Sequence, residues 1–397
     1  MRRALTIVAA IALAGCAGRR GGEAIGVREP VVDSARLVFV GDVMSHTPQV
    51  AAARTSGGGY DYTGVFRHFR PIFEGAHVAV ANLETTLRTR PPYTGYPSFA
   101  APAELAFDLR RAGIDIVTTA NNHICDKGAA GIRSTLAILD SAGIRHTGAF
   151  LDSADRRARH PLRFSAGGLK FALLAYTYGT NGIPVPRGMI VNPIDTAVIA
   201  RDLAGLRRAP GDPTEADPTG IDVVIVSYHW GEEYRPQPTR EQRRIAEWTR
   251  ARGADLVIGG HPHVVEPIEA HLDADSTDVT GATFFSLGNF VSNQIRRHCD
   301  GGIAADITLV RRDSLPLRWD VGWRLAWVHT PWRGGVRRYE VMPAPALDTL
   351  PAAAAVFAAD TRKLLLGEVG DRVRETGSIP VPSSRTTARA VRHTEVP

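Results

Sequence analysis

Short apolar segments that run into glycine or polar residues recur along most of this chain. Residues 37–40, LVFV, lead to Asp42, and residues 255–258, DLVI, lead through two glycines to His261 and His263. Unbroken runs of aliphatic and β-branched residues are typical of strands in a parallel sheet that is covered on both faces. The pattern therefore predicts an α/β protein and disfavours an all-helical or purely antiparallel one.

Segments with helical spacing separate the predicted strands, as such a sheet requires. The strands are expected at residues 37–40, 78–81, 114–117, 223–226, 255–258 and 284–287. The helices are expected at residues 65–74, 102–111, 131–142 and 240–250. Residues 162–176 are predicted to form a hairpin that turns at Gly167-Gly168.

The character of the chain changes after residue 303. Residues 303–310, 318–328 and 337–341 alternate like antiparallel strands, and residues 351–374 are typical of a terminal helix. Trp319, Trp323 and Trp327 fall on one strand face, which favours a packed core. A polar tail at residues 377–397 is predicted to be disordered.

Nearly every predicted strand ends in a polar cluster. The clusters are Asp42, Glu84, Asn122 with His123, His229, His261 with His263, and Asn289. Because the carboxyl ends of the parallel strands of one sheet meet at one edge, we expect these side chains at a single rim, where ligands of α/β sheets bind. Each histidine alone is more typical of a core or surface residue satisfied by hydrogen bonds, so the prediction rests on the whole set.

The polar set has the composition of a metal site. Asp42 and Glu84 supply charge, Asn122 a carbonyl oxygen, and the imidazoles of His229, His261 and His263 supply nitrogen. Such a mixed set suits one or two ions of zinc, manganese or iron rather than calcium. His123 is expected to point away from the ligands, where it can act as a general acid.

The N-terminus is typical of an export signal. A basic start precedes apolar residues 4–14, which are too short to span a bilayer, and Leu13-Ala14-Gly15-Cys16 resembles a bacterial lipobox. We therefore expect a signal peptide over 1–16, a lipid on Cys16 and a tether over 17–35. The protein would be exported and anchored on the periplasmic side, in the outer membrane of a Gram-negative cell. The alternative is an ordinary cleaved signal peptide with an incidental cysteine.

The charge and the cysteine content limit the binding partners and the disulfides that are expected for this chain. The net charge is +6, but the basic residues are scattered, so we expect no nucleic-acid partner, whereas a polyanion remains compatible. The other cysteines, Cys125 and Cys299, could form a disulfide in an exported protein or remain unrelated thiols.

A series of motifs runs along residues 36–310: GDVM (41–44), ANLETTL (81–87), ANNHICDKGAAGIRST (120–135), YTYGTNG (176–182), SYHWGEEY (227–234), GADLVIGGHPHVVEP (253–267) and FSLGNF (285–290). In content and order, this series resembles the CapA family of poly-gamma-glutamate capsule-biosynthesis proteins. The family is similar to the calcineurin-like metallophosphatases. The resemblance implies an α/β fold, a four-layer αββα sandwich over 36–310, with a C-terminal β-rich extension and helix, 311–376, packed on it.

The resemblance also implies roles for the polar residues. Asp42 and His263 match ligands of a first metal, Asn122, His229 and His261 match ligands of a second, Glu84 stands at the bridging position, and His123 matches the catalytic histidine. Met44 departs from the phosphatases, which have a histidine there. His46 could compensate, although a loop histidine is more often incidental. Glu266 stands where the family commonly has glutamine.

Residues beside the predicted ligands are expected to support them or to face substrate. Glu233 could buttress a ligand, Asn289 could fix loop geometry, and Tyr178 and Asn181 belong to a loop expected to face substrate. Trp230 is expected to cover the core rather than stack on a substrate.

Two functions follow from the resemblance. The first is a metal-dependent hydrolase, phosphoesterase-like, that acts in capsule biosynthesis together with capsule-synthesis membrane proteins. The second is a non-catalytic lipoprotein that binds an anionic polymer for export or anchoring. A fold alone does not decide between them.

Overall fold

The computed structural model describes residues 31–204, 206, 220–275, 277–313, 315–347, 349–369 and 372–376. The predicted signal peptide, Cys16, most of the predicted tether and the C-terminal tail lie outside these residues. The chain divides into two compact units, residues 1–31 and 32–397. The second unit contains two large β-sheets.

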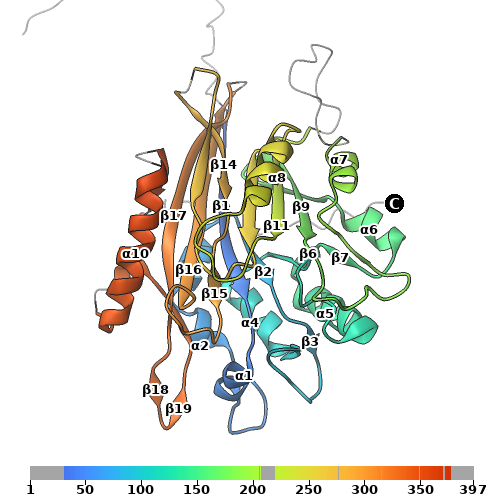
Figure 1. Ribbon diagram of the computed structural model, residues 1–397, viewed down its shortest axis with the longest axis vertical. Helices are drawn as coiled ribbons and strands as arrows, with labels where there is room; N and C mark the ends of the chain where they lie inside the picture. The colour runs from blue at the N-terminus through green and yellow to red at the C-terminus, as the bar shows by residue number, and fades with distance from the viewer. Residues whose placement is uncertain are drawn as a thin grey trace, which may run out of the picture. The chain divides into compact units, whose positions relative to one another are not determined.

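Nine of the described strands form a large mixed sheet (Figure 1). Its order is β20-β17-β16-β1-β2-β5-β6, with β15 beside β1 and β21 beside β17. The strands are β1 (Val32–Val43), β2 (Val78–Leu83), β5 (Ile116–Thr118), β6 (Arg145–Thr147), β15 (Asn289–Val291), β16 (Gly301–Arg312), β17 (Arg318–His329), β20 (Glu340–Pro343) and β21 (Arg374–Glu375). Strands β15, β1, β2, β5 and β6 run parallel, whereas β16, β17 and β20 add antiparallel pairs.

Six described strands form a second mixed sheet in the order β13-β14-β12-β11-β9-β8. They are β8 (Leu162–Ala166), β9 (Leu169–Thr177), β11 (Val223–His229), β12 (Leu256–Gly260), β13 (Ile268–Leu272) and β14 (Val279–Phe284). The four central strands are parallel. The predicted hairpin is confirmed, because β8 and β9 pair antiparallel around Gly167 and Gly168, both in the left-handed region.

The remaining elements are short strand pairs and helices. The strand pairs are β3 (Leu87–Arg88) with β4 (Ala101–Pro102), β7 (Ala149–Phe150) with β10 (Ile190–Val191), and β18 (Trp332–Arg333) with β19 (Val336–Arg337). The helices are α1 (Thr47–Ala53), α2 (Thr63–Phe66), α3 (Arg70–Gly75), α4 (Glu104–Ala112), α5 (Gly128–Ala142), α6 (Ser153–Arg159), α7 (Thr196–Ala204), α8 (Arg240–Arg250), α9 (Ala344–Leu347) and α10 (Ala352–Val369).

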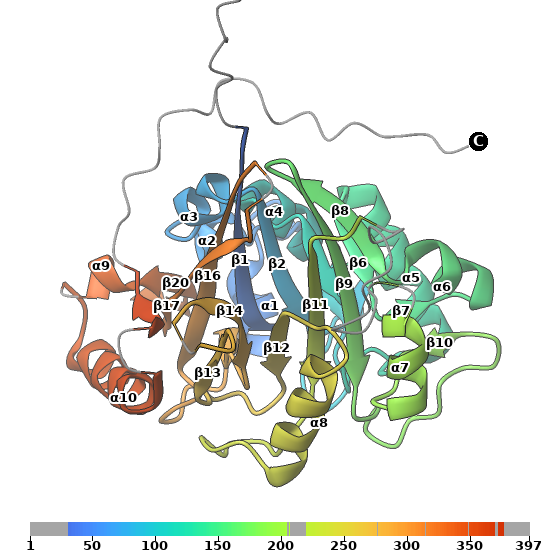
Figure 2. The same ribbon diagram turned by 90° about the horizontal axis from the view of Figure 1, so that it is seen from above.

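The two sheets face each other across a shared apolar core, and helices cover their outer faces (Figure 2). Because side chains alternate along a strand, Leu37 and Phe39 of β1 enter the shared core, while Val38 and Val40 pack toward the helical layer. That outer layer contains α2 to α5, and α7 and α8 cover the second sheet. The molecule is therefore a mixed α/β protein with large sheets flanked by helices.

The C-terminal strands continue the large sheet. Strand β17 pairs with β16 from Arg318 to Trp327, and α10 packs along β13 and β17. Trp323 is fully buried and Trp327 nearly so, both in the shared core, and the partly buried Trp319 packs against it. The prediction that this tryptophan face belongs to the core is confirmed.

Several boundaries differ from the sequence predictions. The predicted helix 65–74 is two short helices, α2 and α3, and the strand predicted at 284–287 ends at Phe284. Strand β1 begins at Val32, inside the predicted tether, because Val32 pairs with Arg312 of the long strand β16. Cys125 and Cys299 are buried free thiols. Among the described residues, no helix combines the length and hydrophobicity needed to cross a membrane.

Candidate metal centre

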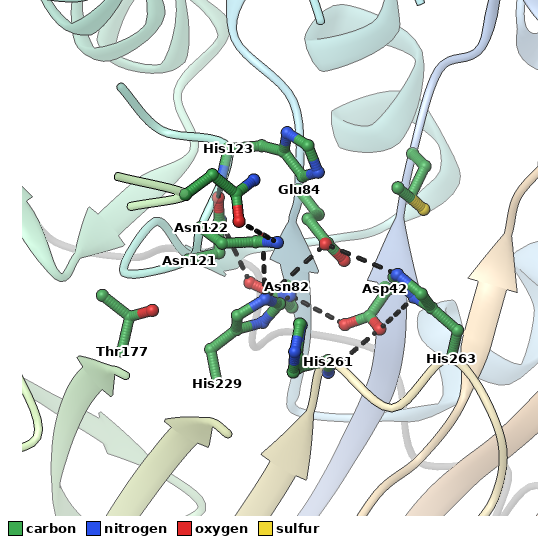
Figure 3. Close-up of polar contacts among 12 residues, drawn as sticks. Asp42, Asn82, Glu84, Asn121, Asn122, His123, Thr177, His229, His261 and His263 are labelled. Carbon is green, nitrogen blue, oxygen red and sulfur yellow. Dashed lines mark hydrogen bonds and ion pairs between the residues drawn. The ribbon is translucent and has the colours of Figure 1, made fainter. Parts of the chain in front are cut away.

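The carboxyl ends of strands from both sheets meet in one buried polar centre (Figure 3). The large sheet provides Asp42 from β1 and Glu84 from just after β2. The second sheet provides His229 at the end of β11, with His261 and His263 following β12. The prediction that one sheet supplies all of these side chains is therefore wrong, because two facing sheets each supply part of the set.

Two groups of three side chains in this centre could each hold a metal ion. The first group is Asp42, Glu84 and His263, and the second is Glu84, His229 and His261. Within each group, one potential ligand atom from each residue lies within 4.8 Å of the others. All of these side chains are buried, and Glu84 belongs to both groups. The two groups are therefore consistent with metal binding, and they share Glu84.

The unsatisfied polar atoms of the centre fit a divalent cation. Both carboxylate oxygens of Glu84 and Nδ1 of His261 are buried without a hydrogen-bond partner. The contact from His229 Nε2 to Glu84 Oε1 is 3.6 Å, too long for a hydrogen bond. Burial, followed by the charge of Asp42, raises the pKa of Glu84 well above its ordinary value. A bound cation would offset the cost of burying the charge of Glu84, and nitrogen and oxygen donors of this kind bind divalent metal ions.

Asp42 is held as an anion by its neighbours. Its Oδ2 lies 3.1 Å from His263 Nδ1 and accepts the backbone N–H of His261 at 3.2 Å. Burial alone raises the pKa of Asp42, but the hydrogen bonds and charge of these neighbours and of Asn82 hold it below its ordinary value. The carboxylate is therefore available for a cation.

Asn82 is a member of the centre that the sequence analysis missed. Its Nδ2 donates to Asp42 Oδ1 at 2.8 Å and lies 3.2 Å from His229 Nδ1, so it joins residues of the two sheets. The available signal was its position two residues before Glu84, because a strand places residues i and i+2 on one face.

Asn122 contacts the second ligand group, and His123 lies beside it as a member of neither group. Asn122 Oδ1 is 2.9 Å from His229 Nε2. His123 turns away, and its Nδ1 lies 2.8 Å from Asp126 Oδ2, an oxygen that also accepts the backbone N–H of Phe99 at 2.6 Å. Asp126 was missed, although the spacing of three residues in the turn NHICD was a usable signal.

The backbone after β12 is shaped by close approach to Asp42. A Cβ atom at Gly260 would lie 2.7 Å from Asp42 Oδ1, so any larger residue there would require the carboxylate of Asp42 to move. His261 and His263 have φ angles of 98° and 59°, which are costly for residues with a side chain. Strained backbone of this kind is typical of functional sites, where surrounding contacts enforce it.

The other residues predicted near the centre have different surroundings. Tyr178 is 48% exposed, and its ring lies 4.5 Å from that of His261. Asn181 accepts hydrogen bonds from Tyr178 and Asn122. The exposed Glu233 makes no hydrogen bond to a predicted ligand among the described residues. Asn289 anchors the loop that follows it, because its Nδ2 donates to Gln294 Oε1 and to the carbonyl oxygen of Cys299.

Three further positions answer questions raised by the sequence. Trp230 is buried against Tyr228 and Phe285, which confirms its place in the core. Met44 is buried, with its sulfur 3.6 Å from Ser292 Oγ. His46 Nδ1 lies 3.1 Å from Gln49 Oε1, and His46 belongs to neither ligand group.

Comparisons with known proteins agree with the motif pattern. Residues 36–294 match the family model described as "Bacterial capsule synthesis protein PGA_cap". The chain is 26% identical over 302 residues to "Capsule biosynthesis protein CapA" of Bacillus anthracis, covering 73% of this chain and 67% of that protein. It is 27% identical over 269 residues to "PGA biosynthesis protein CapA" of Bacillus subtilis (strain 168), covering 64% of this chain and 63% of that protein. The chain therefore belongs to the bacterial capsule synthesis family.

Proposed function

We propose that this protein is a metal-dependent hydrolase of the phosphoesterase type that acts in capsule polymer biosynthesis. The observation that carries the proposal is the unpaired carboxylate of Glu84, shared by two buried ligand groups beside His123. The centre combines a cation site with an acid of suitable type, as metal-assisted hydrolysis requires.

The fold supports the same reading. Two facing mixed sheets with helices on their outer faces correspond to the αββα sandwich of the metallophosphatases, and we assign this type to the protein. The centre lies where such a sandwich presents the carboxyl ends of its central strands.

Each residue has a distinct task in the proposed chemistry. Asp42, Glu84, Asn122, His229, His261 and His263 would hold one or two ions. A bound divalent cation supplies Lewis-acid activation and neutralises charge on the substrate. Asp126 fixes His123 through Nδ1, which leaves Nε2 free to donate a proton to the departing oxygen.

The cellular setting is part of the proposal. Lipidation of Cys16 would anchor the protein in the cell envelope, on the periplasmic side, where capsule-synthesis membrane proteins and an anionic polymer or phosphoester would be its partners. The names of the two relatives, which refer to capsule and PGA biosynthesis, support this setting.

One observation favours a second candidate function. The buried Met44 offers sulfur where the phosphatases have an imidazole, so the first ligand group has only Asp42, Glu84 and His263. A weak first site would suit a non-catalytic protein that binds an anionic polymer for export or anchoring.

Hydrolysis of a generic phosphodiester distinguishes the hydrolase from the non-catalytic polymer-binding protein. The full-length protein, loaded with manganese or zinc, should cleave bis(p-nitrophenyl) phosphate, and His123→Asn should lower kcat by about 10²–10⁴-fold while metal content is unchanged. His298→Asn is the matched control, because His298 is exposed and its left-handed φ suits asparagine. Equal activity of the parent and His123→Asn would contradict the catalytic role.

A further inference from the structure

Exposed aromatic side chains lie at the surface beside the candidate metal centre. Tyr178 is 48% exposed and its ring lies 4.5 Å from that of His261. Tyr234 is 40% exposed and its ring lies 6.0 Å from that of His263. The two tyrosines therefore present apolar faces to solvent next to two of the predicted metal ligands.

Arg296 lies on one of these aromatic faces. Its guanidinium carbon is 3.5 Å from the centre of the Tyr234 ring, a stacking contact that restrains the long side chain. Arg296 is exposed, and among the described residues no carboxylate lies within ion-pair distance of it. By contrast, Arg67 and Arg333 both pair with Glu340. A hydrogen bond to the side chain of Cys299 and, more weakly, the charge of the exposed Glu233 raise the pKa of Arg296. Arg296 thus presents a restrained positive charge near the centre that is not held in an ion pair with any described residue.

The loop that carries Arg296 is fixed at both ends. Asn289 Nδ2 donates to Gln294 Oε1 at 3.0 Å and to the carbonyl oxygen of Cys299 at 2.9 Å. Gln294 Nε2 in turn donates to the hydroxyl of Tyr234 at 3.4 Å. These contacts give Asn289 the loop-fixing role that its position predicted.

Tyr234 is also tied to the loop of the metal ligands. Its backbone N–H donates to the carbonyl oxygen of Pro262, between His261 and His263, at 2.7 Å. Its φ of 68° shows that the backbone bends sharply to make this contact. The position of the Arg296 charge relative to the centre is therefore set by a chain of contacts rather than by a free side chain.

The chemistry of this surface selects a class of ligand. A guanidinium held in place binds an oxyanion such as a carboxylate, and the tyrosine faces can pack against methylene groups. A polymer whose carboxylates are separated by short apolar stretches matches both features. A small phosphomonoester would reach only the metal centre.

We propose that Arg296, stacked on Tyr234, is a specificity-determining residue that binds a carboxylate of an anionic polymer next to the metal centre. The inference rests on the proposed function, which places the reacting group of the substrate at the metal centre. Tyr234 acts as a positioning residue because it holds the guanidinium.

Binding of a short γ-linked glutamate oligomer tests the proposal. Its Kd is measured by calorimetry on the full-length protein, with manganese and after chelation, beside inorganic phosphate as a probe of the centre alone. Arg296→Gln should weaken oligomer binding about tenfold, the worth of one charge-assisted contact, and leave phosphate binding and metal content unchanged. Arg244→Gln, the same charge change at an exposed position paired with Glu241, should have no effect.

Variants of Tyr234 show whether this residue positions the guanidinium of Arg296 or is needed only for folding. Tyr234→Asn, which tolerates the left-handed φ, should weaken oligomer binding as Arg296→Gln does, and Tyr234→Phe should restore it. Equal affinity of Arg296→Gln and Arg244→Gln, or equal binding of a neutral γ-linked glutamine oligomer, would overturn the proposal. So would a parent that binds metal and phosphate but not the oligomer, an outcome that leaves the hydrolase proposal intact. Arg296-dependent oligomer binding by a parent that holds no metal would support this inference and contradict the hydrolase.

Discussion

Glu84 and His123 divide the work of the centre at the scale of single residues. Glu84 is shared by both ligand groups and has no hydrogen-bond partner, so its buried charge requires a cation. His123 has its Nδ1 fixed by Asp126 and is kept apart from the ligand groups. One residue thus suits metal binding, and the other suits proton transfer.

Asp126→Asn tests how His123 is oriented. Loss of the carboxylate at 2.8 Å from His123 Nδ1 should lower kcat for the phosphodiester by about 10–100-fold, because the imidazole loses its fixed orientation. Metal content should not change. An unaltered kcat in Asp126→Asn would show that Asp126 does not act through His123.

Glu266 gives a prediction about pH and stability. The side chain is buried, accepts a hydrogen bond from Gln242 Nε2 at 2.7 Å, and has one unsatisfied oxygen. Burial raises its pKa from 4.5 to about 8. The folded state therefore holds a proton that the unfolded state releases. The contribution of this group to stability is fully present below about pH 4.5 and is lost as the pH rises to about 8.

Glu266→Gln should remove this loss. Relative to the parent, the free energy of unfolding of the variant should be higher at pH 8 than at pH 5 by on the order of 2–4 kcal/mol. Urea denaturation of the metal-free proteins at both pH values measures the difference. Glu269→Gln is the control, because Glu269 lies partly exposed beside Arg243. Identical pH dependence in the parent and Glu266→Gln would contradict a buried proton at this position.

At the scale of elements, strand ends determine where the ligands lie. Asp42 of β1 approaches the backbone of β12 at Gly260, whereas Gly259 lies against the carbonyl oxygen of Phe285. The chain then bends through the left-handed region at His261. The centre thus depends on the packing of β1 against β12 as much as on the ligands themselves.

Gly260→Ala tests this close approach. The added Cβ would lie 2.7 Å from Asp42 Oδ1, so the carboxylate must move or the strands must separate. We expect metal affinity to fall at least about tenfold, as when a supporting contact is lost, while the protein remains folded by circular dichroism. Gly57→Ala, whose new Cβ would have 4.0 Å of clearance, should bind metal normally. Normal metal affinity in Gly260→Ala would show that Asp42 is not a ligand in this geometry.

The sequence predicted individual helices and strands better than the contacts between them. Helix α8 follows from the regular spacing of its apolar residues, and the strand that ends at His229 follows from its unbroken apolar run. The start of β1 at Val32 could not be predicted in this way, because it is fixed by pairing with the distant Arg312 of β16. Asn82 and Asp126 were missed as well, because contacts with His229 and His123 connect them to the centre.

At the scale of the whole molecule, one core holds both halves of the centre. The shared core takes side chains from β1 and β2 of the large sheet, from β9 and β11 of the second, and from β17 and α10 near the C-terminus. The two ligand groups therefore keep their spacing only while the sheets remain packed together.

Trp323→Ala tests this coupling. Trp323 is fully buried in the shared core, and its truncation should lower the free energy of unfolding by about 3–5 kcal/mol. Loss of bound metal and loss of far-UV circular dichroism should follow one urea transition, displaced together to lower urea. Trp332→Ala, at a 67% exposed position, should leave the transition in place. Metal release well before unfolding in Trp323→Ala would show that the centre does not depend on this core.

Metal content is the most direct test of the central claim. The full-length protein, purified without chelators and reconstituted with manganese or zinc, should hold one or two ions per chain, and the double variant His261→Ala, His263→Ala should lose them while remaining folded. Because each ligand group contains one of these histidines, both sites are removed together. Absence of metal from a folded parent, or unchanged metal in the double variant, would contradict the assignment of this centre and leave polymer binding as the better account.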